Sequence, residues 1–189
     1  PRRSGRASEL ESQGFSVADG LEQASRLGAN LCIIATETGR HAEDGLRAME
    51  LGFDVLMEKP MASDAAGARS LQEASKKTGR NLFVGCVMRF SDSLNIFRDW
   101  LPKAGTVHSV RIECQSYLPD WRPAQDYHES YSARPVEGGV LLDLIHEVDY
   151  AGWIFGWPKE IQGRLKNTGR LRISSEEMAE ITWETDSGT

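Results

Sequence analysis

The sequence has little that would tie it to a membrane, a nucleic acid or an oxidising compartment. No apolar run approaches the roughly 20 residues that span a bilayer, and no secretory signal opens the chain. Acidic side chains outnumber basic ones by 28 to 22, and the net charge of -6 argues against nucleic acid or an anionic membrane as a partner. The three cysteines, Cys32, Cys86 and Cys114, lie in apolar runs without metal-ligand spacing. We therefore expect reduced thiols, no metal site and a cytoplasmic protein.

The first half of the chain alternates between helix and strand patterns. Apolar runs at 30–35, 54–59 and 81–86 predict parallel strands buried on both faces. Helical spacing of apolar residues predicts helices between these strands, which is the doubly wound α/β pattern. Helices are expected over 6–13, over 21–27, from Thr38 or Gly39 onward, and over 63–79. Asp19 is expected to cap the helix over 21–27, and Ser63 and Gly79 to begin and end the helix over 63–79. A short strand is expected over 15–17.

The central strand of this part ends in Glu58-Lys59-Pro60. Proline cannot extend a strand ladder, so the strand stops where the carboxylate and the ammonium stand. Open α/β sheets bind their ligands at the carboxyl ends of the strands, which places this ion pair at the expected ligand edge. The alternative is an ordinary surface salt bridge in a loop.

The second half has a different pattern, which predicts an α+β domain with a mixed, largely antiparallel sheet. Apolar spacing predicts a helix over 91–102, and alternation of apolar and polar residues predicts a strand over 107–114. Three further strands are expected over 161–165, 170–174 and 178–184. A sheet that ends in an alternating strand favours pairing with a partner, so we expect a homo-oligomer formed through this sheet.

Residues 117–137 form the least regular stretch of the chain and are rich in aromatic, arginine and hydroxyl side chains. Such side chains stack on sugar faces and hydrogen-bond to polyols. Trp121, Arg122 and Tyr127 are therefore candidates for the sugar side of a binding site, and the stretch is interpreted as a lid over a substrate. A subunit contact is the alternative, because the same residue types mark interfaces.

Asp143 and His146 are three residues apart in a predicted helix, and Asp149 continues the row. On one continuous helix these side chains share a face. A carboxylate beside an imidazole suits proton transfer, with His146 accepting the hydroxyl proton and Asp143 orienting the substrate or the ring. The alternatives are a helix that is merely anchored to the sheet by these groups, and a metal site, for which two ligands are thin support.

Four motifs follow one another along the chain: Ala35-Thr36-Glu37-Thr38 followed by His41, then Glu58-Lys59-Pro60, then Val84-Gly85-Cys86-Val87-Met88-Arg89-Phe90, and last Gly138-Gly139 with Asp143, His146 and Asp149. In this order they resemble the Gfo/Idh/MocA family of NAD(P)-dependent oxidoreductases. One family feature is missing: a dinucleotide-binding sheet opens with a strand and Gly-x-Gly-x-x-Gly, and no Gly-x-Gly occurs here. The chain therefore resembles a fragment of such a protein.

The resemblance implies a partial Rossmann domain over 1–87 and a partial substrate and oligomerisation domain over 88–189. It implies hydride transfer between NAD or NADP and a secondary hydroxyl of a sugar, nucleotide sugar or polyol. Lys59, Asp143 and His146 would be catalytic and would contact the substrate, while Thr36, His41, Glu58, Lys59 and Arg89 would line the nicotinamide side. Since the glycine loop is missing, the alternative is a non-catalytic sugar-binding or scaffold relative that has lost its cofactor.

Overall fold

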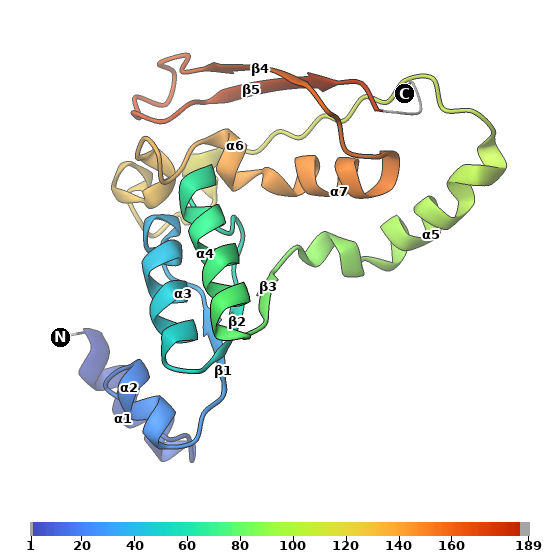
Figure 1. Ribbon diagram of the computed structural model, residues 1–189. Helices are drawn as coiled ribbons and strands as arrows, with labels where there is room; N and C mark the ends of the chain where they lie inside the picture. Colours follow the sequence, from blue (N-terminus) through green and yellow to red (C-terminus); the bar gives the residue numbers. More distant parts are fainter. Residues whose placement is uncertain (1, 186–189) are drawn as a thin grey trace.

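The computed structural model describes the backbone of residues 2–185 and the side chains of residues 6–185. Its first region, defined here as residues 2–86, is built on a parallel sheet of three strands in the order β1-β2-β3. The strands are β1 (Leu31–Ile34), β2 (Asp54–Met57) and β3 (Leu82–Val84), and the helices between them are α3 (His41–Glu50) and α4 (Ala65–Thr78). Figure 1 shows α3 and α4 side by side next to this sheet. The three apolar runs thus form the predicted strands.

The two faces of this sheet differ in burial. Ile34, Val55 and Met57 face the packed layer formed with α3 and α4 and are almost inaccessible to solvent. Strand register places Ile33 beside Leu56 and Phe83 on the other face, where Ile33 and Phe83 stay exposed. The prediction of strands buried on both faces is therefore wrong for the described residues, because α3 and α4 both cover the same face.

The helix ends follow local hydrogen bonding. Helix α1 covers Arg2–Ser12 and α2 covers Leu21–Arg26, close to the predicted ranges, but residues 15–17 form no strand. Gly20, and not Asp19, stands at the start of α2. The start of α4 is capped by Asp64, whose carboxylate accepts from the backbone N–H of Gly67 at 2.7 Å, and not by Ser63. Gly79 ends α4 in the left-handed conformation, as predicted.

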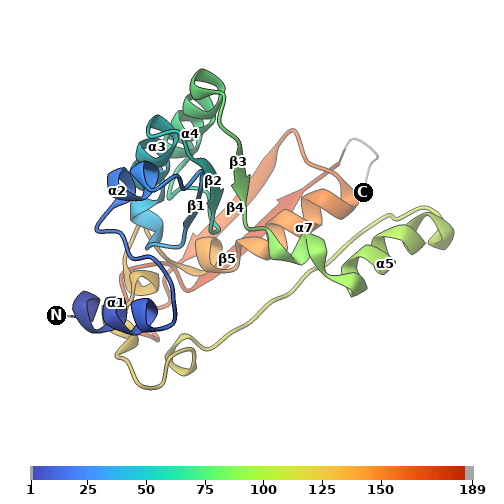
Figure 2. The same ribbon diagram turned by 90° about the horizontal axis from the view of Figure 1, so that it is seen from below.

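The second region, residues 87–185, begins where the chain leaves β3. A short 3₁₀ turn η2 (Val87–Phe90) leads to α5 (Asp92–Trp100), which projects away from the sheet (Figures 1 and 2). After η3 (Leu101–Ala104) the chain runs extended, but residues 107–114 pair with no strand among the described residues. The predicted strand there is wrong, because alternation fits an extended chain whether or not a partner supplies the ladder.

Two helices and a hairpin complete the described chain. Helices α6 (Val140–Asp143) and α7 (Ile145–Phe155) lie beneath an antiparallel pair, β4 (Ile161–Lys166) and β5 (Met178–Trp183) (Figure 1). The predicted strand at 170–174 is wrong: these residues form the bend between β4 and β5 and dock on the loop before α6, where the Ser174 N–H donates to the Ala133 carbonyl. The expected class, an α/β parallel sheet followed by a part with antiparallel strands, is confirmed.

Candidate functional site

Lys59 follows β2 at the carboxyl edge of the parallel sheet. The Glu58 N–H donates to the Ile34 carbonyl at 2.8 Å, and the Gly85 N–H donates to the Met57 carbonyl at 2.7 Å, so the ends of all three strands are tied together. From this edge the Lys59 ammonium reaches into the second region and donates to the backbone carbonyl of Asp143 at 2.6 Å. Two residues that are 84 positions apart, both predicted as catalytic, are thereby brought together.

The helix that carries Asp143 and His146 is not continuous. Leu144 has φ -101° and ψ 29°, outside the helical range, and separates α6 from α7. Asp143 is therefore the last residue of one helix and His146 belongs to the first turn of the next. The prediction that they share the face of one helix is wrong, because the break at Leu144 reorients α7. A shared helix face remains only for His146 and Asp149, which are three residues apart within α7.

The Asp143 carboxyl lies among polar groups of the loop that precedes α6. Burial raises its pKa, and hydrogen bonds from Ser132 and Tyr131 and the charge of Lys59 oppose that rise. The pKa of Tyr131 is raised as well, by burial and then by the charge of Asp143. Tyr131 and Ser132 were not predicted as partners of Asp143. Their place in a polar loop just before the double glycine was the available signal, but the loop alone does not reveal its contact.

His146 has a buried ring nitrogen, Nδ1, without a hydrogen-bond partner among the described residues. Buried polar atoms are nearly always hydrogen-bonded, so an unpaired one marks a place where a ligand or water completes the bonding. The pKa of the Asp149 carboxyl, three residues further along α7, is lowered mainly by Arg89 and in part by His146. Nδ1 is therefore the ring atom of His146 that a ligand or water would meet.

Of the residues predicted to line the nicotinamide side, Thr36 and Glu58 keep exposed polar groups at the sheet edge. The Thr36 hydroxyl donates to the Asp44 carboxylate at 2.8 Å, which leaves its oxygen able to accept. The Glu58 carboxylate accepts weakly from the N–H of Lys59, at 3.3 Å. Both groups remain available to a ligand at this edge.

His41 and Arg89 are placed differently, because protein groups contact both ring nitrogens of His41 and two of the three guanidinium nitrogens of Arg89. The His41 ring is 1% exposed, with Nδ1 at 2.7 Å from the Pro60 carbonyl and Nε2 at 3.0 Å from the Thr36 carbonyl. It therefore ties the turn after β1 to the turn after β2, next to Lys59. The Arg89 guanidinium donates through Nε and Nη2 to the two carboxylate oxygens of Asp149, at 2.9 and 2.6 Å.

The three predicted sugar-side residues lie apart from one another. The Trp121 indole N–H donates to the Ser116 hydroxyl, and Trp121 shares the lining of a cavity of about 60 Å³ with Asp143. The Arg122 guanidinium lies 6.0 Å from the centre of the Tyr131 ring. The Tyr127 hydroxyl donates to the Leu171 carbonyl at 3.1 Å, which turns it toward the bend between β4 and β5. Only Trp121 lines a cavity together with a predicted catalytic residue.

A larger cavity, of about 360 Å³, lies on another side of α7. It is bounded by residues 110–114, α6, α7 and β5, and most of its lining residues are apolar, with Arg111 and Glu147 as the charged ones. Lys59 and His146 do not line it, so size alone does not identify the site here; the convergence of polar groups at Lys59 and Asp143 does. Among the described side chains, no three His, Cys, Asp or Glu residues gather closely enough to hold a metal ion, and no described helix is long and apolar enough to cross a membrane.

The groups at the sheet edge fit one end of a nicotinamide dinucleotide. A cation, a carboxylate and a hydroxyl, from Lys59, Glu58 and Thr36, can bind the carboxamide and the hydroxyls of the neighbouring ribose. The backbone cradle for a pyrophosphate needs closely spaced glycines before a helix, and the 189 residues contain no Gly-x-Gly. The residues present therefore fit the nicotinamide end of the cofactor only.

Comparison with known proteins covers almost the entire chain. Residues 2–86 match the model of an oxidoreductase family with an NAD-binding Rossmann fold, and residues 103–189 match the GFO/IDH/MocA C-terminal domain. The predicted cofactor class, NAD or NADP, agrees with that fold.

Three individual matches give the level of similarity. An inositol 2-dehydrogenase of Streptomyces avermitilis is 29% identical over 133 residues, which cover 68% of this chain and 35% of that protein. A trans-1,2-dihydrobenzene-1,2-diol dehydrogenase of Mus musculus is 30% identical over 156 residues, which cover 78% of this chain and 44% of that protein. The WlbA dehydrogenase of Bordetella pertussis, solved with NADH and UDP-GlcNAcA, superposes with a TM-score of 0.78 at 20% identity, covering 96% of this chain and 53% of that one.

The chain spans about half or less of the length of these relatives. Within that span both halves of the family architecture are present in order, with Lys59 at the end of a Rossmann strand and Asp143 and His146 on the helices of the second region. The protein belongs to the Gfo/Idh/MocA family of oxidoreductases.

Proposed function

We propose that this protein transfers a hydride between NAD(P) and a secondary hydroxyl of a sugar, nucleotide sugar or polyol. The observation that carries the proposal is the contact of the Lys59 ammonium with the Asp143 carbonyl, at 2.6 Å across the two regions. In this proposal residues 1–87 hold the cofactor and residues 88–189 hold the substrate. The inositol and diol dehydrogenases and the UDP-sugar complex among the relatives support the substrate class.

Lys59 would bind the reacting hydroxyl and stabilise its developing negative charge. An ammonium has three N–H groups, and the Asp143 carbonyl takes only one, so two remain for a substrate oxygen. This fixed cation lies at the sheet edge, where the nicotinamide would supply the hydride acceptor. A preorganised charge at the oxygen lowers the barrier, since it needs no reorientation as the negative charge develops.

His146 would accept the hydroxyl proton. Its Nδ1 is buried and has no partner within the described part of the chain, and a neutral imidazole nitrogen without a proton is a base suited to neutral pH. Asp143 would orient the substrate, because Tyr131 and Ser132 hold its carboxyl while its oxygens retain acceptor capacity. Thr36 and Glu58 would bind on the nicotinamide side, and Trp121, with Arg122 and Tyr127 farther out, on the sugar side.

The direct test is titration of the purified protein with NADH and NADPH, followed by oxidation assays with polyols, sugars and nucleotide sugars. With an active substrate in hand, Lys59→Ala should lower turnover by roughly 10³-fold, the scale of losing an electrostatic contact to the reacting oxygen. Lys103→Ala is the matched control, since Lys103 belongs to η3 and its ammonium lies over the ring of Trp100 at the end of α5, away from the site. Near-normal turnover of Lys59→Ala would refute the assignment.

One observation favours a second candidate, a non-catalytic sugar-binding protein: the chain contains no Gly-x-Gly to hold a pyrophosphate. A folded protein that binds a sugar or polyol by calorimetry, with neither NADH nor NADPH binding at millimolar concentration, would support this candidate. It would also remove the role of Lys59 in hydride transfer.

We further propose that copies of the protein associate through the second-region sheet and that it works in the cytoplasm. All six residues of β4 are exposed, including Ile161 and Leu165, which offers an apolar surface for a partner. The three cysteines are free thiols, as a reducing compartment would leave them. Sedimentation of the protein and of an Ile161→Glu, Leu165→Glu variant would test the association; equal masses would refute an interface at β4.

A further inference from the structure

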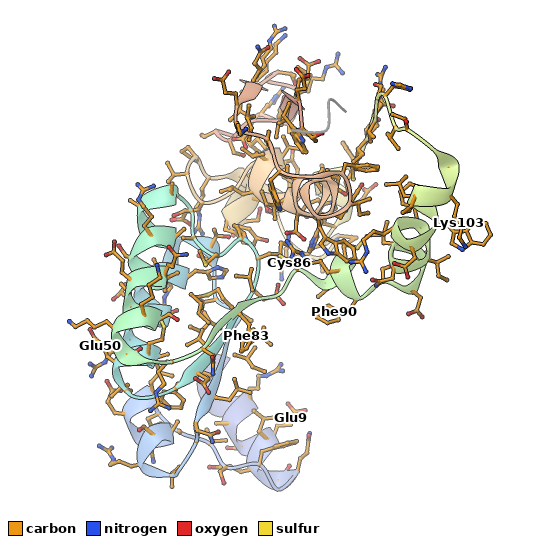
Figure 3. All side chains as sticks on the ribbon, turned by 45° about the vertical axis from the view of Figure 1, so that its right-hand side comes forward. Glu9, Glu50, Phe83, Cys86, Phe90 and Lys103 are labelled. Carbon is orange, nitrogen blue, oxygen red and sulfur yellow. The ribbon has the colours of Figure 1, made fainter. Side chains whose placement is uncertain are left out.

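Arg89 and Asp149 form an ion pair between the turn that leaves the parallel sheet and helix α7. Arg89 belongs to η2, just after Cys86 at the point where the chain leaves the first region (Figure 3). Asp149 lies in α7, 60 residues later. Two guanidinium nitrogens each bind a separate carboxylate oxygen, at 2.9 and 2.6 Å, the bidentate geometry that combines strength with a fixed orientation.

The Asp149 side chain is 12% exposed, and three groups converge on it. Burial alone would raise its pKa, but hydrogen bonds from Arg89 and Cys86 and the charges of Arg89 and His146 lower it overall. Cys86 and Arg89 both come from the crossover after β3, so this segment holds α7 at one point through two side chains. The pKa of Cys86 is raised in turn by burial and by Asp149.

We propose that Arg89 and Asp149 form a clasp that positions His146 against the carboxyl edge of the parallel sheet, and that Arg89 is a positioning residue and not a cofactor ligand. The inference rests on the proposed function where it treats His146 as the proton acceptor. His146 precedes Asp149 by three residues, which is less than one turn of α7. Fixing Asp149 to the crossover therefore also fixes the distance from His146 to the strand ends that carry Lys59.

The positioning role and the cofactor-ligand role make different demands on the Arg89 guanidinium. Two of the five N–H donors of Arg89, at Nε and Nη2, serve Asp149, and a ligand that drew them away would leave a largely buried carboxylate without its ion-pair partner. A clasp needs both partners equally, whereas a ligand role needs Arg89 alone. The two roles are therefore distinguished by comparing changes at the two positions.

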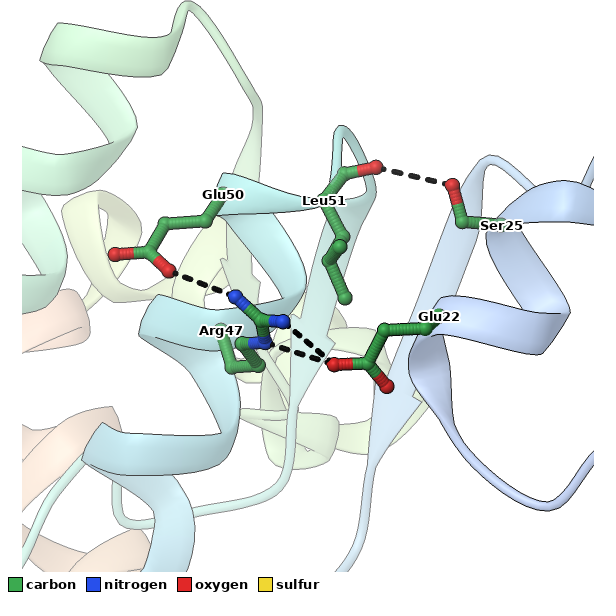
Figure 4. A network of polar contacts seen from close by, with 5 residues as sticks. All are labelled: Glu22, Ser25, Arg47, Glu50 and Leu51. Atoms are coloured by element: carbon green, nitrogen blue, oxygen red, sulfur yellow. Dashed lines mark hydrogen bonds and ion pairs between the residues drawn. The ribbon is translucent and has the colours of Figure 1, made fainter.

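A second arginine–carboxylate pair provides the control, although both of its guanidinium nitrogens bind the same carboxylate oxygen. Arg47 donates through Nε and Nη2 to Glu22, at 3.0 and 2.6 Å, and through Nη1 to Glu50, but all three side chains are about half exposed or more (Figure 4). This network joins α2 to α3 within the first region and lies away from His146. An exposed pair of this kind contributes little to stability.

The first experiment is a pair of double-mutant cycles on unfolding by denaturant. The variants are Arg89→Met, Asp149→Asn and their combination, set against Arg47→Met, Glu22→Gln and their combination. We expect each single clasp variant to raise the unfolding equilibrium constant about tenfold. In the double variant this constant should rise by a factor at least about fivefold smaller than the product of the two single factors. For the Arg47 pair we expect coupling below about twofold. Multiplicative effects at Arg89 and Asp149 would overturn the clasp.

The second experiment asks what the clasp does for the site. The chain has four histidines, so the ring signals resolve in a proton–carbon NMR spectrum, and His146→Gln assigns the one of interest. Arg89→Met and Asp149→Asn should both move the His146 signal, and Arg47→Met should not. NADH affinity should stay within about twofold in both clasp variants, and turnover should fall about tenfold or more with KM for the alcohol unchanged.

The outcomes separate the two proposals. A tenfold or larger loss of NADH affinity in Arg89→Met, with Asp149→Asn unaffected, would make Arg89 a cofactor ligand and overturn the inference. An unmoved His146 signal in both variants would reduce the pair to a structural contact and also overturn it. If no variant and no parent protein binds NADH, the proposed function fails, while the cycle and the His146 signal still decide whether the clasp exists.

Discussion

The two regions of the molecule are held together in different ways. Among the described residues, eight of the ten buried hydrophobic side chains lie between Ile34 and Leu71 in the first region, and only Ala133 and Ala151 lie in the second. The strands show the same contrast: β2 alternates half-buried and buried positions, whereas every residue of β4 is exposed. The first region has a packed core, and the second relies on strand pairing and polar contacts.

This difference bears on the site, because the site takes residues from both regions. Lys59 follows a strand whose Val55 and Met57 are fully buried, so its backbone position is set by packing. Asp143 and His146 come from helices with fewer buried apolar side chains, and the contacts Lys59–Asp143 and Arg89–Asp149 join these helices to the first region and its crossover. We expect changes in the first region to alter mainly stability, and changes at polar contacts of the second region to alter mainly site geometry.

The largest effect should come from removing a buried ring from the first region. Phe53 is 1% exposed, and Phe53→Ala should lower the free energy of unfolding by about 3–5 kcal/mol, through lost burial and the cavity left behind. Phe97 in the second region is 47% exposed and meets Phe155 edge to face at 6.2 Å. Phe97→Ala should cost roughly 1 kcal/mol. Urea unfolding of both variants measures the contrast, and equal losses would contradict a core confined to the first region.

The second largest effect should come from His41, which links two turns of the first region. His41→Phe removes both ring nitrogens, which lie close to the Pro60 and Thr36 carbonyls; a neutral ring donates to one of these carbonyls at a time, so the change leaves at least one without its donor. The expected loss is about 2–3 kcal/mol of unfolding free energy, the scale of leaving buried polar groups unsatisfied. His128, which stacks on Tyr127 in an exposed turn, is the control: His128→Phe should change stability by less than about 0.5 kcal/mol.

Much of the first region was predictable because its signals are local. Three apolar runs gave three strands, and Gly79 ended its helix as expected, since glycine accepts the left-handed conformation there. Strand burial was less predictable. An apolar run does not indicate which face of the strand a helix will cover. Ile33 and Phe83 lie on the uncovered face and are exposed.

The site was predicted residue by residue but not in its contacts. The motif placed Lys59 at a strand end. Its partner, the Asp143 carbonyl, lies 84 residues away. Because every residue has a backbone carbonyl, a side-chain pattern could not predict this contact. The break at Leu144 was equally hidden, because the residues from Val140 onward keep helical composition across it. The alternation at 107–114 gave a wrong strand prediction for a related reason. A strand needs a partner strand, and the local sequence does not show whether one is present.

A smaller effect should distinguish the helix cap that forms from the one that was predicted. The Asp64 carboxylate accepts from the Gly67 N–H at the start of α4, so Asp64→Ala should cost about 1 kcal/mol of unfolding free energy. Ser63→Ala should change it by less than about 0.5 kcal/mol, because Asp64 holds the cap position. Thermal and denaturant unfolding of the two alanine variants give the comparison. A larger loss at Ser63 would contradict the observed start of α4.

The smallest effect should be the pH dependence contributed by Asp143 in the second region. Burial raises the pKa of its carboxyl above the value of about 3.9 expected in the unfolded chain. Between these two values the folded state keeps a proton that the unfolded state has lost. Stability therefore falls as pH rises through this window, and Asp143→Asn removes that fall. Measured from pH 3 upward, the stability of Asp143→Asn relative to the parent should increase with pH and then level off.

Asp126, in the loop before α6, should behave in the opposite sense. Hydrogen bonds from the backbone and side chain of His128 lower the pKa of its carboxyl, so its contribution is present above the unfolded value and is lost as pH falls. Asp126→Asn should therefore lose stability relative to the parent as pH rises. Opposite pH slopes of relative stability for the two asparagine variants would support two different environments in the second region. The Asp143 carboxyl near Lys59 would be destabilised in its charged form by burial, and the Asp126 carboxyl would be stabilised in its charged form by His128. Parallel slopes would mean that Asp143 is solvated and that the site is more open than its contacts with Tyr131 and Ser132 imply.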